Sequence, residues 1–226
     1  NSNFGSSAGE VYYASKSFIS VEVAKWIEEA GIGIDVCTGG ELAVALAAKF
    51  PPDRIEVHGN NKSEEEIISA IEVGVAKIVI DSMQEIERVD RIAKAANKVQ
   101  KVLLRITPGV EAHTHEAIST AHEDVKFGFS IASGAAWKAI NAAQSAANLS
   151  LEGLHCHIGS QIFENEGFIL ATKRLLELSA KFRDEFKSEL SELDLGGGYG
   201  IAYLAGDKTF DPKQVMAALA ELVKSE

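Results

Sequence analysis

Apolar and polar positions along the first half of the chain follow a pattern that repeats about every 22 residues. Short runs rich in β-branched residues, typical of strands, are followed by longer runs with apolar residues at helical spacing. The strand-like runs are centred near Tyr13, Ile34, Val57, Val79 and Leu103. Because a helix after each strand returns the chain to the start of the next, the repeat predicts parallel strands with right-handed crossovers, which close most naturally into a barrel.

The same pattern, with a longer period after residue 107, predicts elements along most of the chain. Strands are expected at residues 11–17, 32–38, 54–59, 77–82, 101–107, 151–158 and 192–195. Helices are expected at 20–30, 40–50, 84–97, 133–147, 167–186 and 211–224, with one more that begins at Ser63. Glu66 stands three residues after Ser63, which is the capping-box pattern.

These elements predict an α/β fold, a (β/α)8 TIM-type barrel of which seven strands out of eight are visible. An open barrel would leave two bare strand edges, which folded proteins avoid. We therefore expect the sequence to be a fragment of a longer protein that lacks at least the eighth strand. Residues 1–10 are expected to form a loose lead-in, and residues 11–226 a partial barrel domain.

Side-chain parity gives each predicted strand an apolar face and a polar end. The apolar face must meet the helices, and the opposite face points into the barrel. Near its C-terminal end every strand carries one ionisable residue on that second face: Lys16, Asp35, His58, Asp81, Arg105, His157 and Asp194. A barrel built only for stability would fill this layer with branched apolar side chains, because buried charge is costly. The polar ring predicts an active site, with Lys16 as the candidate reactive amine.

A glycine run directly after the seventh predicted strand is a candidate phosphate site. Gly196, Gly197 and Gly198 would let backbone N–H groups turn toward an anion, and barrels often bind phosphate in this loop. Gly159 and Ser160, after the sixth strand, could add a hydroxyl to the same cradle. The alternative interpretation of the glycine run is a tight turn between a strand and a helix.

Two further motifs lie at the predicted mouth of the barrel. His155 and His157 share a strand face and could bind a metal, with added ligands from the long loop after Thr107: His113, His115 and His122. Because no familiar zinc spacing is present, we predict no metal, and an imidazole at this place can instead lie flat on an aromatic cofactor. The run from His58 to Lys62 puts amides and a second amine at the rim. Lys62 is the one serious rival to Lys16, although an ordinary polar loop would look similar.

Composition narrows the class of protein. A net charge of -11 argues against nucleic acid or an anionic membrane as a partner. No apolar run reaches the length of a membrane span, and no signal peptide is recognisable. Cys37 and Cys156 lack the spacing of a disulfide framework, so we expect a soluble protein of the reducing cytoplasm.

An amine, a phosphate cradle and an imidazole platform together indicate a phosphorylated aldehyde cofactor. Pyridoxal 5'-phosphate forms a Schiff base with lysine, needs its phosphate anchored, and withdraws electrons from the α-carbon of an amino acid. A neighbouring cation would lower the pKa of Lys16 and favour this reaction, and Arg105 is the candidate.

The sequence resembles the barrel domain of the diaminopimelate decarboxylase family, which belongs to the pyridoxal-phosphate enzymes with alanine-racemase-like barrels. The motifs that carry the resemblance are Tyr13-Ala-Ser-Lys-Ser-Phe18, Asp35-Val-Cys-Thr-Gly-Gly-Glu-Leu42, His58-Gly-Asn-Asn-Lys-Ser63, Thr107-Pro-Gly-Val-Glu-Ala-His-Thr-His-Glu116, Lys126-Phe-Gly-Phe129, Gly153-Leu-His-Cys-His-Ile-Gly-Ser-Gln161 and Asp194-Leu-Gly-Gly-Gly-Tyr-Gly200. The motifs that begin at His58 and Thr107 point to diaminopimelate rather than to ornithine or arginine.

The resemblance implies decarboxylation of meso-2,6-diaminopimelate to L-lysine, the last step of lysine biosynthesis, by an enzyme that is a homodimer at full length. It implies catalytic roles for Lys16, which carries the cofactor, and His157, which stacks on its ring. Ser160 and the glycines at 196–198 would hold the phosphate. Asp35, His58 and Arg105 would complete the cofactor site.

The family's Glu-Pro-Gly-Arg motif and its C-terminal β-domain are absent, so the fragment is expected to be impaired. Two alternatives have no turnover: a single-domain pyridoxal-phosphate homeostasis protein, and a non-catalytic relative that acts as a regulator. An ornithine- or arginine-type decarboxylase is a third. The polar loop from Gly109 to Asp124 is expected to be mobile.

Overall fold

The computed structural model describes residues 9–110, 126–207 and 209–224. The strands are β1 (Tyr12–Ala14), β2 (Gly33–Val36), β3 (Ile55–Val57), β4 (Lys77–Ile80), β5 (Gln100–Thr107), β6 (Phe129–Ser130), β7 (Leu149–Cys156) and β8 (Glu192–Asp194). The helices are α1 (Val21–Glu29), α2 (Gly39–Ala47), α3 (Glu64–Val73), α4 (Met83–Ala95), α5 (Ala135–Ser145), α6 (Glu166–Phe186) and α7 (Pro212–Lys224), with 3-10 turns at Ser15–Ser17 and Pro52–Arg54. The predicted alternation of strands and helices is confirmed.

The strands follow the order β1-β2-β3-β4-β5-β7-β8, and β6 pairs with β5. The registered pairs are parallel, as the helical crossovers require. Strand β6 was not predicted because its two residues are too few for a periodic signal. The predicted mobility of residues 109–124 falls mostly on residues 111–125, which lie outside the described part of the chain, as do His113, His115 and His122.

The chain divides into two compact units. Of the described residues, the N-terminal unit contains 10–104 and 138–152, and the C-terminal unit contains residue 9 and residues 105–110, 126–137, 153–207 and 209–224. Among the described residues, no helix has the length and apolar character needed to cross a membrane.

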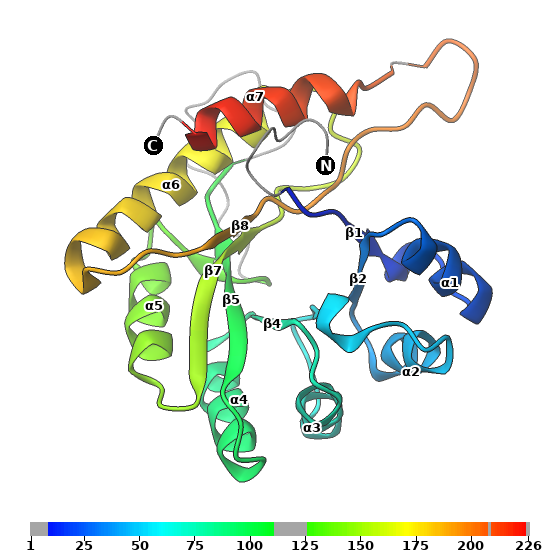
Figure 1. Ribbon diagram of the computed structural model, residues 1–226. Coiled ribbons are helices and arrows are strands. Elements are labelled where there is room, and N and C mark those ends of the chain that lie inside the picture. The colour runs from blue at the N-terminus through cyan, green and yellow to red at the C-terminus, as the bar shows by residue number, and fades with distance from the viewer. Residues whose placement is uncertain (1–8, 111–125, 208, 225–226) are drawn as a thin grey trace. The chain divides into compact units, whose positions relative to one another are not determined.

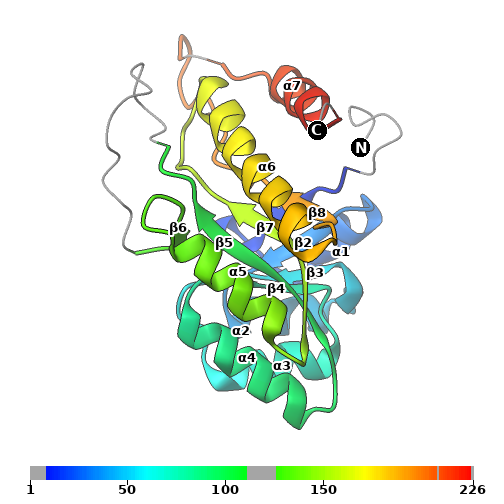
Figure 2. The same ribbon diagram turned by 90° about the vertical axis from the view of Figure 1, so that its left-hand side faces the viewer.

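Helices α1 to α4 of the N-terminal unit each begin at a hydroxyl residue. The hydroxyl accepts a hydrogen bond from the amide three residues later, which satisfies one of the free N–H groups at a helix start. The N-cap residues are Ser20, Thr38, Ser63 and Ser82. Consecutive helices contact each other, so that α1 lies beside α2 (Figure 1) and α3 beside α4 (Figure 2). The predicted capping box at Ser63 and Glu66 is confirmed.

The C-terminal unit has its own apolar core, to which α6 and α7 both contribute, and these two helices lie side by side (Figure 1). Phe168 and Leu219, both almost fully buried, belong to this core. The ring of Tyr199 lies 4.9 Å from that of Phe168 and 5.2 Å from that of Phe210. Because Tyr199 follows the glycine run, these aromatic contacts fix that run on the core.

Candidate functional site

Lys16 lies in a 3-10 turn directly after β1, not on the strand itself. The prediction of a strand up to residue 17 is wrong because serine side chains turn the backbone there: Ser17 Oγ donates to Ala14 O at 2.9 Å. Ser15 is buried, and its Oγ donates to Asp35 O at 2.7 Å and contacts Glu41 Oε2 at 3.1 Å. Lys16 itself is exposed. An anchored backbone therefore presents an accessible amine.

His58 and Asp35 meet in the N-terminal unit, as the polar ring predicts. His58 Nε2 lies 2.5 Å from Glu56 Oε1 and 3.6 Å from Asp35 Oδ1. Because both neighbours are carboxylates, Nε2 is the hydrogen-bond donor of the imidazole. Asp35 and His58 are both largely buried, so this cluster is held away from bulk water.

Glu56 and Lys77 extend this cluster, and neither residue was predicted from the sequence. Glu56 is 1% exposed and Lys77 is 7% exposed. Glu56 Oε2 lies 3.7 Å from Lys77 Nζ, which lies 5.0 Å from the centre of the Tyr12 ring. Burial raises the pKa of Tyr12, and Lys77 partly opposes that rise. A signal was available, since Glu56 stands two residues before His58 and so shares its strand face.

Lys62 is buried, which contradicts its prediction as a second amine at the rim. It is only 2% exposed, and its Nζ lies 3.1 Å from Glu85 Oε1. Burial lowers the pKa of Lys62, and Glu85 opposes that change. Asp81, another member of the predicted ring, is buried beside this pair, and its backbone N–H donates to Glu85 Oε2 at 2.8 Å. Lys16 is therefore the accessible amine of the two candidates.

The pKa of Cys37 depends on the charged side chains around it, which include Lys16. Burial raises the pKa of the Cys37 thiol to about 11, and the carboxylates of Asp35 and Glu41 add to that rise. Lys16 and Lys62 partly offset it. The thiol is therefore protonated at neutral pH and is no nucleophile. Cys156, by contrast, is a fully buried core residue.

The glycine run forms a narrow backbone cradle in the C-terminal unit. Gly196 has φ +66° and Gly198 has φ +99°, values that favour glycine. A Cβ on Gly196 would come within 2.4 Å of Cys156 O, and one on Gly198 within 1.9 Å of Gly159 O. Nothing lies within 4 Å of a Cβ on Gly197. The glycine run thus approaches the backbone of Cys156 and Gly159 closely at Gly196 and Gly198, and the space around Gly197 stays open.

The loop after β7 lies against this glycine run, as the shared cradle predicts. Ile162 N donates to Gly198 O at 2.9 Å, and Gly200 N donates to Ile162 O at 2.8 Å. The His157 ring is adjacent, since a Cβ on Gly196 would lie 3.3 Å from its Nδ1. Ser160 is exposed in the same loop. Backbone N–H groups, a hydroxyl and an imidazole face are the chemistry that a phosphorylated aromatic ring needs, so these residues fit such a cofactor.

Two other members of the predicted ring have local partners in this unit. Gly196 N donates to Asp194 Oδ1 at 2.7 Å, so Asp194 shapes the start of the glycine run. The guanidinium of Arg105 lies over the Phe127 ring, 4.3 Å from its centre. The proposed effect of Arg105 on Lys16 stays a prediction. His155 is buried on β7 and pairs in register with Asp194.

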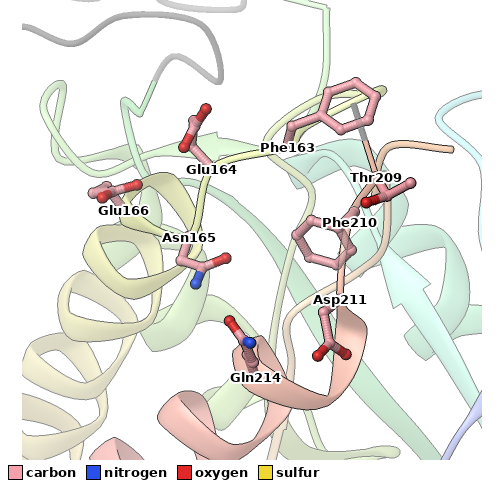
Figure 3. Close-up of a pocket in the computed structure, with 8 residues that line it drawn as sticks. All are labelled: Phe163, Glu164, Asn165, Glu166, Thr209, Phe210, Asp211 and Gln214. Carbon is pink, nitrogen blue, oxygen red and sulfur yellow. The ribbon is translucent and has the colours of Figure 1, made fainter. Parts of the chain in front are cut away.

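A separate cavity of about 340 Å³ lies where the loop after β7 meets the start of α7 (Figure 3). Three of its lining residues are carboxylates, Glu164, Glu166 and Asp211, and none belongs to the predicted ring. A phosphate would be repelled by these charges, so the cavity is a poor candidate for the cofactor.

Comparisons with known proteins point to the same chemistry. A family model described as "Pyridoxal-dependent decarboxylase, pyridoxal binding domain" matches residues 1–226. Diaminopimelate decarboxylases of Mycobacterium bovis and Mycobacterium tuberculosis are each 53% identical over 227 residues, which cover 99% of the chain and 51% of the relative. That of Bacillus subtilis is 44% identical, with 95% and 49% covered. The chain spans about half the length of the curated relatives it matches.

Solved structures of diaminopimelate decarboxylases align with the chain over almost its whole length. Diaminopimelate decarboxylase from M. jannaschii in co-complex with L-lysine aligns with a TM-score of 0.87 at 32% identity, covering 99% of the chain and 52% of that structure. The Helicobacter pylori enzyme complexed with L-lysine aligns with a TM-score of 0.88 at 26% identity, covering 99% and 56%. These alignments confirm the predicted α/β fold class of the barrel type.

Proposed function

Because the chain belongs to the pyridoxal-binding-domain family of pyridoxal-dependent decarboxylases, we propose that it serves in the decarboxylation of meso-2,6-diaminopimelate to L-lysine. The observation that carries the proposal is Lys16, an exposed amine on a turn anchored by the buried Ser15. The substrate assignment is supported by relatives of up to 53% identity named diaminopimelate decarboxylases and by solved neighbours complexed with L-lysine.

Different residues of the chain would hold different parts of pyridoxal phosphate. Lys16 would hold the aldehyde carbon through its Nζ, and His157 would support the aromatic ring. The backbone of Gly196, Gly197 and Gly198 would hold the phosphate together with Ser160. The close approach of Gly198 to Gly159 keeps that cradle narrow.

The remaining polar residues act on charge and orientation. Asp35 and His58 would line the site, and Glu56 keeps the Nε2 proton of His58 directed toward carboxylates. Arg105 would add a positive charge. When bound, the cofactor supplies an acceptor for the electron pair left on the α-carbon as the carboxylate departs as carbon dioxide. A homodimeric assembly, a cytoplasmic location and the absence of nucleic-acid or membrane partners stay predictions from the sequence.

The test is covalent trapping on the chain itself. The protein is mixed with pyridoxal phosphate, its absorbance spectrum is recorded, and the adduct is fixed with borohydride and mapped by peptide mass spectrometry. We expect the label on Lys16, and no label there in Lys16→Met. Lys25→Met is the matched control, because Lys25 is an exposed lysine of the same unit.

Trapping at Lys62, or equal labelling of many exposed lysines, would contradict the assignment of Lys16. Failure to form any adduct would contradict the proposal that this chain binds the cofactor. Substrate choice is tested separately, by measuring lysine formed from meso-diaminopimelate against amine formed from ornithine or arginine.

A further inference from the structure

The buried amine of Lys62 makes a complete set of contacts. Its Nζ donates to Gly59 O at 2.6 Å and to Val79 O at 2.7 Å, and it lies 3.1 Å from Glu85 Oε1. An ammonium has three N–H donors and no acceptor. Three acceptors at hydrogen-bond distance therefore match a charged lysine, and no N–H is left to point into a site.

These contacts join three different elements. Gly59 belongs to the loop of residues 58–63 between β3 and α3, Val79 lies on β4, and Glu85 lies in the first turn of α4. Arg88, also on α4, donates from Nη1 to Lys62 O at 3.0 Å. Helix α4 thus holds the 58–63 loop through both the side chain and the backbone carbonyl of Lys62.

Glu85 transmits this hold to the end of β4. Its Oε2 accepts from Asp81 N at 2.8 Å, while its backbone N–H donates to Ser82 Oγ at 3.3 Å. The carboxylate therefore fixes the start of α4 and accepts Lys62 at the same time. Burial raises the pKa of Glu85, and the charge of Lys62 opposes that rise, as expected of a pair that holds its charges together.

The 58–63 loop in turn carries His58. His58 N donates to Val36 O at 2.8 Å, and its ring reaches Glu56. Gly59 has φ +107°, and a Cβ there would come within 3.2 Å of Cys37 O. The loop is thus pressed against the end of β2 on one side and tied by Lys62 to β4 and α4 on the other.

Lys62 has no room to act as a reactive amine. The cavity beside it, lined also by Cys37, Leu42 and Glu66, has a volume of about 10 Å³. A phosphorylated aldehyde is far larger. To reach it, the ammonium would have to leave all three acceptors and uncover the buried Glu85 carboxylate, which is costly.

We propose that Lys62 is a positioning residue that, with Glu85, clamps the 58–63 loop and so holds His58 in place for the cofactor. The effect on the cofactor rests on the proposed function, whereas the clamp itself does not. The proposal predicts that loss of the ammonium frees the loop while β4 and α4 keep their structure.

The experiment compares Lys62→Met with the wild-type chain and with Lys25→Met, which removes an exposed lysine paired only with Glu22 at the surface. Backbone hydrogen exchange is followed by mass spectrometry without cofactor. We expect exchange about tenfold faster in peptides covering residues 58–63, and unchanged exchange in β4 and α4 as well as in β7 and α6. Pyridoxal phosphate should then be captured with about tenfold weaker affinity. Lys25→Met should match the wild type in both.

Each other outcome overturns the proposal. Unchanged exchange at residues 58–63 would show that there is no clamp, and faster exchange throughout the chain would show a general structural role. A freed loop with unchanged cofactor affinity would refute the positioning role. If Lys62→Met does not fold, Glu85→Gln, which keeps an oxygen for Asp81 N, must show the same local change in milder form. A wild-type chain that captures no cofactor would refute the proposed function, and exchange at residues 58–63 would still decide the clamp.

Discussion

Replacing Gly198 with alanine should destabilise the protein strongly, because the glycine run has no space for a side chain there. A Cβ would lie 1.9 Å from Gly159 O and 3.0 Å from the Gly159 carbonyl carbon. Ordinary contact begins near 3.4 Å, so the two backbones would have to separate by more than 1 Å. They are joined through Ile162, whose N–H donates to Gly198 O at 2.9 Å.

Three contributions add up for Gly198→Ala. The positive φ of +99° costs an alanine about 1–2 kcal/mol. Weakening the bond from Ile162 N costs about 1 kcal/mol. Forced displacement of a packed backbone costs about 1 kcal/mol or more. We therefore expect the free energy of unfolding to fall by about 3 kcal/mol or more.

Gly197→Ala is the matched control, since the neighbouring glycine has open space around its Cβ position. Its effect on the free energy of unfolding should be within about 0.5 kcal/mol. If the phosphate occupies that open space, Gly197→Ala should nevertheless weaken capture of pyridoxal phosphate. The pair of variants therefore separates the structural use of a glycine from its use in binding.

The assay is urea unfolding followed by circular dichroism, with the free energy extrapolated linearly to water. Equal stabilities of the Gly198→Ala and Gly197→Ala proteins would refute the argument from close approach. Cofactor capture is then measured on whichever variants fold. Unchanged capture by Gly197→Ala would place the phosphate away from the middle of the run.

Three further predictions follow from single contacts. The pKa of Glu66 lies below its ordinary value because the backbone N–H groups of Ser63 and Gly39 bind its carboxylate. Because solvent screens this carboxylate, Glu66→Gln should destabilise the protein by at most about 1 kcal/mol at pH 7. A carboxyl group whose pKa is lowered by folding stabilises the protein above its unfolded pKa, so the difference seen in urea unfolding should shrink as the pH falls below 4.5 and vanish once it has passed the lowered pKa of the folded state. Alkylation of Cys37, followed by mass spectrometry, should rise with a midpoint near pH 11 instead of 9.0, and a midpoint near 9.0 would contradict its burial. Phe168→Ala should lower the free energy of unfolding by about 3–5 kcal/mol, measured by urea unfolding, with Phe210→Ala as a less buried control.

The regular part of the fold could be predicted because its signals are local and repeated. Strand-like runs at a steady spacing give the parallel order, and the capping-box pattern at Ser63 and Glu66 gives the start of α3. The end of β1 was predicted wrongly because Ser15 and Ser17 compete with strand pairing through their own hydrogen bonds, and residue periodicity does not register such bonds.

The candidate site could be predicted in its residue types but not in its partners. Parity correctly brought Asp35 and His58 together. It gave no reason to expect Lys77 beside Glu56, because that pair depends on the register between β3 and β4. Lys62 was misplaced for a related reason: a lysine in a polar loop is usually solvated, and only the acceptors supplied by other elements keep this one buried.

A repeated glutamate explains how these buried charges are sustained. In α2, α3 and α4 the third helical residue is Glu41, Glu66 or Glu85. Each carboxylate accepts a backbone N–H at or just before the start of its own helix: Cys37 N, Ser63 N and Asp81 N.

The same three carboxylates also reach the segment that follows the preceding strand: the turn after β1, the start of α2 and the 58–63 loop. Glu41 contacts Ser15 Oγ, Glu66 accepts from Gly39 N at 2.7 Å, and Glu85 pairs with Lys62. A substitution at one helix start should therefore be felt at the loop before it, including the turn that presents Lys16. The polar strand ends tolerate their charges because each repeat supplies the hydrogen bonds that its predecessor needs, which isolated capping boxes would not do.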